Sequence, residues 1–146
     1  MASRDWHPSR TKHFKAYGGL WPPHCIQNTP GAGFHPDLKL PSQALIVSKG
    51  MDPETDSYSA FQAKDPQGCL LGDLLRSLEI RELFVGGLAT DYCVKSSVLD
   101  ALRYGFNVHV LTDAIQGVEV HPGDSQKALE EMTSHGAKKT TLSLLS

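Results

Sequence analysis

The hydrophobic pattern changes character near residue 44 of the chain. Beyond that point, short apolar runs alternate with longer segments whose apolar residues recur at helical spacing. The runs that predict strands are "ALIVSK" (44–49), "LFVGG" (83–87), "VHVLTD" (108–113) and "TTLSLL" (140–145). The segments that predict helices are 72–80, 92–105 and 123–136. Strands that are apolar on both faces and alternate with helices indicate an α/β fold with a parallel sheet covered on both sides.

The predicted helices carry recognisable ends. In the segment 92–105, an apolar stripe is formed by Val94, Val98, Ala101 and Leu102. Gly105 is a candidate C-cap residue at the end of this helix. In the segment 123–136, Asp124 or Ser125 could cap the start.

Residues 1–43 have a different composition, rich in Pro, Gly, His and aromatic residues and without periodicity. Such a stretch predicts a long ordered loop, and loops of this kind usually carry function. We therefore expect binding chemistry within 1–43.

Length and charge narrow the class of protein. A chain of 146 residues suits one domain, and a net charge of −2 without a basic run argues against nucleic acid and anionic membranes as partners. No stretch approaches the roughly 18 apolar residues of a membrane span, and the polar start "MASRDWHPSR" lacks the apolar core of a signal peptide. Three cysteines without CxxC spacing make a disulfide framework improbable, so we expect a cytoplasmic protein with reduced thiols.

Cys93 lies where the apolar run of "LFVGGLATDYC" passes into a helix. Ligands of open parallel sheets bind beyond the carboxyl ends of the strands, and the first turn of a helix offers backbone N–H groups that favour a thiolate or a developing oxyanion. The sequence around Cys93 thus leaves two roles open, a nucleophile or a small buried packing residue.

A candidate metal site is carried by "RDWHP" and "WPPHC". Asp5, His7 and His24 would make a three-ligand set for Zn²⁺, Fe²⁺ or Mn²⁺ with positions left open for water or substrate. Because the chain has seven histidines, spacing alone also allows each of them to be an ordinary loop histidine.

The segments "SRDWHP", "LWPPHCIQNTPGAGFHPDL", "VSKGMDPETDSYSAF", "GLATDYCVKSS", "LTDA" and "HPGDSQKALEEM" occur in this order along the chain. Together they resemble the nicotinamidase/pyrazinamidase branch of the isochorismatase-like cysteine hydrolases. The resemblance covers nearly the whole chain. It implies a three-layer α/β/α fold with a mostly parallel sheet.

The resemblance also implies catalytic roles. Cys93 would be the nucleophile that forms a thioester, and Lys49 would hold its thiolate by charge. The family has a cis peptide bond that falls here at Leu88–Ala89, which would aim the Ala89 N–H at the substrate oxygen together with that of Cys93.

In the family, the residues matching Asp5, His7 and His24 bind a metal that holds the pyridine nitrogen of the substrate, and His13 matches an extra ligand of some members. Zn²⁺ is the expected ion. Trp21 and Tyr58 match aromatic positions that line the substrate pocket.

The implied reaction is hydrolysis of nicotinamide, and of pyrazinamide, to the acid and ammonia, a step of NAD salvage. The expected partner is this small-molecule substrate. The resemblance also leaves open whether the protein forms a homo-oligomer. Two alternatives are a non-catalytic metal- or ligand-binding remnant of such an enzyme and an isochorismatase-like hydrolase of another small substrate.

One feature departs from the family, whose first strand carries a catalytic aspartate in a stretch resembling "ALIVVDVQNDF". The present sequence has no such stretch, and Asp5 belongs to the predicted metal set. We therefore interpret residues 1–146 as a single, N-terminally shortened domain, with 1–43 as its metal- and substrate-binding loop region. Without a central strand, two sheet edges would be exposed, and we expect the short chain to be poorly folded or inactive.

Overall fold

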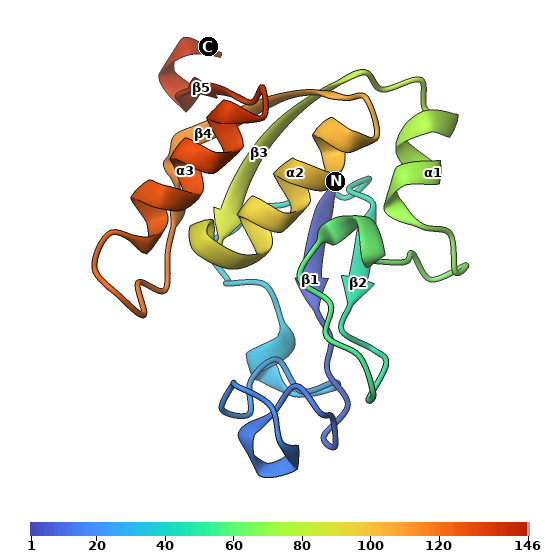
Figure 1. The fold of residues 1–146 in the computed structure, drawn as a ribbon. Coiled ribbons are helices and arrows are strands. Elements are labelled where there is room, and N and C mark those ends of the chain that lie inside the picture. The colour runs from blue at the N-terminus through green and yellow to red at the C-terminus, as the bar shows by residue number, and fades with distance from the viewer. Residues whose placement is uncertain (146) are drawn as a thin grey trace. The chain divides into compact units, whose positions relative to one another are not determined.

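A computed structural model describes residues 1–145 and divides the chain into two compact units, Met1–Leu71 and the residues from Gly72 onward. The second unit is built from the alternating strands and helices (Figure 1). Its parallel sheet has the order β3-β4-β5. The strands are β3 Glu82–Leu88, β4 Asn107–Gln116 and β5 Lys138–Thr140.

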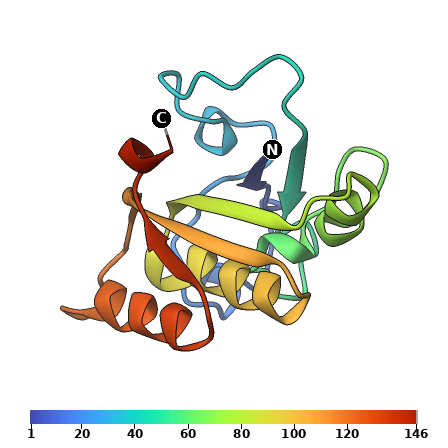
Figure 2. The same ribbon diagram turned by 90° about the horizontal axis from the view of Figure 1, so that it is seen from above.

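Two helices of the second unit, α2 (Lys95–Arg103) and α3 (Asp124–Ser134), lie side by side on one face of this sheet (Figure 2). The core between sheet and helices is apolar: Val98, Val110 and Met132 are fully buried. The third helix, α1 (Leu71–Ser77), precedes β3. The apolar stripe predicted in 92–105 lies on the buried face of α2, where Val98 and Ala101 are buried.

The first unit contains little regular structure. Its two strands, β1 Ala2–Asp5 and β2 Ile46–Lys49, pair in parallel, with Asp5 opposite Lys49. Long loops and short 3₁₀ turns make up the rest, and the turns are Lys15–Tyr17, Pro30–Ala32 and Ala60–Gln62.

Each unit has a sheet with an open edge. Within residues 1–145, β1 pairs only with β2, and β3 pairs with β4 along one edge only. Two apolar side chains of β3 are exposed, Phe84 at 45% and Leu88 at 74%. The expectation that a missing central strand leaves two sheet edges exposed stays a prediction.

The parallel α/β class predicted from the sequence is confirmed, and three local predictions are wrong. The strand expected at 140–145 lies at Lys138–Thr140, because Leu142–Leu144 forms a 3₁₀ turn. The strand β1 lies inside the region read as loop, since its four residues carry no apolar pattern. The N-cap residue of helix α3 is Gly123 and not Asp124 or Ser125, and no side chain makes a capping hydrogen bond there.

No helix within the described part of the chain is both long and apolar enough to cross a bilayer.

The end of α2 agrees with the sequence prediction. Gly105, the residue predicted to end the helix, follows it with a φ of +85°.

Candidate active site and metal centre

The parallel pairing of β1 and β2 brings a carboxylate and an amine together in the first unit. Lys49 is only 5% exposed, and its ammonium donates to the carboxylate of Asp5 and to the carbonyl oxygen of Ser57, the latter at 3.0 Å. A buried charge is tolerated only when it is paired and hydrogen-bonded, and these contacts supply both. The strand ends thus hold Lys49 in one place.

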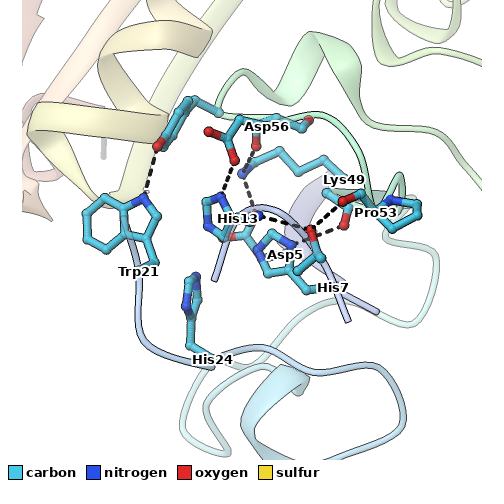
Figure 3. Close-up of polar contacts among 12 residues, drawn as sticks. Asp5, His7, His13, Trp21, His24, Lys49, Pro53 and Asp56 are labelled. Carbon is cyan, nitrogen blue, oxygen red and sulfur yellow. Dashed lines mark hydrogen bonds and ion pairs between the residues drawn. The ribbon is translucent and has the colours of Figure 1, made fainter. Parts of the chain in front are cut away.

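Three histidines gather next to this pair, as Figure 3 shows. One nitrogen from each of His7, His13 and His24 lies within 4.8 Å of the others. The rings of His7 and His13 stack with centroids 4.4 Å apart, and His24 lies 5.1 Å from His7 and 5.3 Å from His13. The fully buried Phe14 contacts all three rings. Spacing of this order allows three imidazoles to share one cation.

Each imidazole is held through its Nδ1 atom. Gly50 offers a carbonyl oxygen to His7 at 3.0 Å, and Pro22 offers one to His24 at 2.8 Å. A carbonyl oxygen only accepts, so Nδ1 of these two rings carries the proton and Nε2 keeps the lone pair. The Nε2 atom of His7 is buried and has no hydrogen-bond partner among residues 1–145. A buried lone pair in that position fits a metal ligand, and the donor set suits Zn²⁺.

Burial lowers the pKa of His7 from 6.5 to about 4. The nearby charge of Asp5 raises the pKa and opposes this effect, while His13 and His24 lower it further. His7 is therefore neutral at neutral pH, which is the form that binds a metal.

A glycine makes room for the cluster. Gly50 adopts a φ of +69°, and a Cβ atom there would lie 2.4 Å from Cε1 of His7. Its backbone can approach the ring only because no side chain is present.

Aromatic side chains border the cluster on one side. The indole N–H of Trp21 donates to the hydroxyl of Tyr58 at 2.9 Å, and the ring of His13 lies 6.2 Å from Trp21 and 6.0 Å from Tyr58. The structure thus places these two predicted pocket residues together and next to the histidines.

Cys93 lies in the second unit, half-buried on a π-helical turn, Thr90–Val94, between β3 and α2. Turns of this kind are rare and occur frequently at functional sites. The peptide bond Leu88–Ala89 is cis, which confirms that prediction. Asp91 ties the turn to the end of β4, because its carboxylate accepts from the N–H groups of Val118 (2.9 Å) and Glu119 (2.8 Å).

The predicted site residues therefore fall into two groups. Asp5, His7, Trp21, His24, Lys49 and Tyr58 belong to the first unit, whereas Ala89 and Cys93 belong to the second. The roles of all of them, and the pairing of Cys93 with Lys49, stay predictions. His13 lies in the histidine cluster together with His7 and His24, whereas the resemblance implied it only as an extra ligand of some family members. Asp56, which contacts His13, carried no signal in the sequence beyond its place in "DSYSAF".

Comparison with known proteins places this arrangement in a family. Residues 2–143 match the model of the isochorismatase domain. The chain belongs to the isochorismatase family. Its relatives in the family include a nicotinamidase of Escherichia coli, which is 44% identical over 97% of this chain and 74% of its own length.

Solved structures of the isochorismatase family agree with this assignment. The pyrazinamidase of Pyrococcus horikoshii in complex with zinc has a TM-score of 0.86 and 42% identity, covering 96% of this chain and 73% of that one. PnC1 of L. infantum in complex with nicotinate has a TM-score of 0.86 and 34% identity, covering 97% of this chain and 70% of that one. The resemblance to the nicotinamidase and pyrazinamidase branch is thereby confirmed.

Proposed function

We propose that the chain is a metal-assisted cysteine amidohydrolase that converts nicotinamide to nicotinate and ammonia, and pyrazinamide to its acid, in cytoplasmic NAD salvage. The observation that carries this proposal is the cluster of His7, His13 and His24 beside the buried Lys49. It occurs in a chain 44% identical to a nicotinamidase over nearly all of its residues.

The metal would be held by the histidine cluster, with Asp5 in the predicted ligand set. When bound, Zn²⁺, or alternatively Fe²⁺ or Mn²⁺, supplies a Lewis-acid contact for the pyridine nitrogen of the substrate. A zinc complex of a 42% identical pyrazinamidase supports this assignment. Trp21 and Tyr58, joined by their hydrogen bond, would present aromatic faces to the flat ring.

Cys93 would act as the nucleophile. A bond forms between its Sγ and the carboxamide carbon, the C–N bond breaks, and the thiol proton leaves on the nitrogen as ammonia. Water then attacks the thioester carbon, which releases nicotinate and restores the thiol. The ammonium of Lys49 would stabilise the thiolate, and the N–H groups of Ala89 and Cys93 would donate to the carbonyl oxygen.

Ammonia release from nicotinamide by the purified, zinc-loaded protein tests this proposal, and it decides between the proposal and the expectation from the sequence that residues 1–146 alone are poorly folded or inactive. Replacing the nucleophile, Cys93→Ala, should lower the rate at least about 1,000-fold, because a thioester can no longer form. The matched control is Cys69→Ala, which changes an exposed cysteine and should leave the rate unchanged. Mass spectrometry of the quenched wild-type reaction should show a nicotinoyl group on the peptide that contains Cys93.

Three results would contradict the proposal. Ammonia release that is equal in the wild type and in Cys93→Ala would exclude the thioester route. Zinc binding by the wild type without ammonia release would instead support the metal-binding remnant. Release from a different amide only would support the alternative hydrolase.

A further inference from the structure

The loop of residues 50–58, which follows β2, supplies the hydrogen-bond acceptors for two of the three clustered histidines. The carbonyl oxygen of Gly50 accepts from His7 at 3.0 Å. The carboxylate of Asp56 lies 2.5 Å, Oδ1 to Nδ1, from His13 (Figure 3). The loop therefore sets the orientation of both rings from outside the cluster.

The same loop also fixes the backbone that carries His13. The carbonyl oxygen of Pro53 accepts from the hydroxyl of Thr11 at 3.2 Å and from the N–H of Lys12 at 2.8 Å. The hydroxyl of Thr11 in turn accepts from the N–H of His13 at 3.2 Å. Both the main chain and the ring of His13 are thus held by residues 53–56.

His13 differs from its two neighbours in the charge of its partner. His7 and His24 each donate to a neutral carbonyl oxygen, whereas His13 donates to a carboxylate. A charge-assisted hydrogen bond is shorter and about twice as strong as a neutral one, and it makes the opposite nitrogen a better donor of electrons. The side chain of His13 is also 6% exposed, against 46% for Asp56, so the contact spans the edge of the buried cluster.

We propose that Asp56 is a positioning residue of the metal centre: it accepts the Nδ1 proton of His13 and holds the ring with the Nε2 lone pair available to the cation. The inference deepens the proposed function and rests on its metal site. Asp56 acts only through His13, so its contribution should vanish when His13 is absent. Around the ring of His13, the rings of His7, His24, Phe14, Tyr58 and Trp21 pack with centroids 4.4 to 6.2 Å away, whereas the carboxylate of Asp56 contacts its Nδ1 atom.

Zinc affinity of the purified protein, measured by competition with a chromogenic chelator, tests this role without any need for turnover. Asp56→Ala should weaken zinc binding about 10–100-fold, the usual cost of losing such a partner. Asp56→Asn should fall between the wild type and Asp56→Ala, because the amide oxygen still accepts the proton but lacks the charge. Asp37→Asn, at an exposed aspartate near the exposed His35, is the matched control and should bind zinc like the wild type.

A double-mutant cycle distinguishes positioning from a general effect on folding. If Asp56 acts through His13, the variant carrying both His13→Ala and Asp56→Ala should bind zinc no more weakly than His13→Ala alone. The visible spectrum of the Co²⁺-loaded protein supplies a second measurement, since it reports the ligand set. Asp56→Ala should shift it towards the spectrum of His13→Ala.

The outcomes separate this inference from the proposed function. Wild-type zinc affinity in Asp56→Ala, or additive losses in the cycle, would overturn the role of Asp56 and leave the hydrolase proposal intact. Coupled losses in a protein that binds zinc but releases no ammonia would support the role of Asp56 and overturn the hydrolase. Failure of the wild type to bind zinc would overturn both.

Discussion

The two units differ in what they bury. In the second unit most buried side chains are apolar, and they lie mainly on β4, α2 and α3. In the first unit polar side chains are buried together with apolar ones, and they are His7, Thr11, His13, Lys49 and Ser59. The buried polar side chains of the second unit, Thr90 and Asp91, lie on the turn that carries Cys93. Apolar burial stabilises without regard to direction, whereas buried polar groups need defined partners. In the first unit, therefore, the contacts that hold the fold are also those that form the site.

Two glycine substitutions test this difference most strongly. Gly50→Ala adds a methyl group 2.4 Å from His7 at a φ of +69°. We expect it to displace the ring and to weaken zinc binding about 100-fold or more. Zinc titration followed by chelator competition measures the effect.

The control comes from the second unit. Gly105 also has a positive φ, +85°, but an added methyl group would meet nothing within 4 Å. Gly105→Ala should lower the free energy of unfolding by about 1 kcal/mol and leave zinc affinity unchanged. Equal zinc affinity in Gly50→Ala and Gly105→Ala would show that the histidine cluster does not depend on this close approach.

A core truncation tests the opposite behaviour. Met132 on α3 is fully buried, so Met132→Ala should lower the free energy of unfolding of the second unit by about 2–5 kcal/mol. Urea unfolding followed by circular dichroism measures this loss. Zinc affinity at neutral pH without denaturant should stay that of the wild type, and a marked loss of affinity would mean that the core of the second unit supports the metal site.

The same contrast explains what the sequence could predict. Helices α2 and α3 follow from apolar periodicity, because residues such as Val98 and Met132 recur on the buried face. Strand β1 could not be found in this way, since "ASRD" carries no such pattern and forms a strand through pairing with β2. Regular elements are predictable where local pattern and burial agree.

The site was predictable only in part, for a related reason. His7 and His24 stand in motifs shared with the family, and the structure brings their rings to 5.1 Å. The partnership of Asp56 with His13 joins residues 43 positions apart, and no periodicity encodes such a contact. The ion pair of Lys49 with Asp5 likewise depends on the register of two strands, which the sequence did not reveal.

Acidification should weaken the first unit of the metal-free protein. The pKa of His7 is about 4 in the folded chain and 6.5 as its ordinary value, so below pH 6.5 the unfolded chain binds a proton that the folded chain does not. The contribution of neutral His7 to stability is therefore complete above pH 6.5 and is lost as the pH falls towards 4. From pH 7.5 to pH 5 the loss is about 2 kcal/mol.

Hydrogen exchange in the presence of a chelator can locate this loss. Protection of amides in β1 and β2 should fall between pH 7.5 and pH 5, after correction for intrinsic exchange, while protection in β4 should change less. His7→Gln removes the titrating group and should flatten the pH dependence, whereas His35→Gln, at an exposed histidine, should retain it. An equal loss of protection in both units would show that acid destabilises the whole chain. The buried polar groups of the first unit would then not be the cause of the loss.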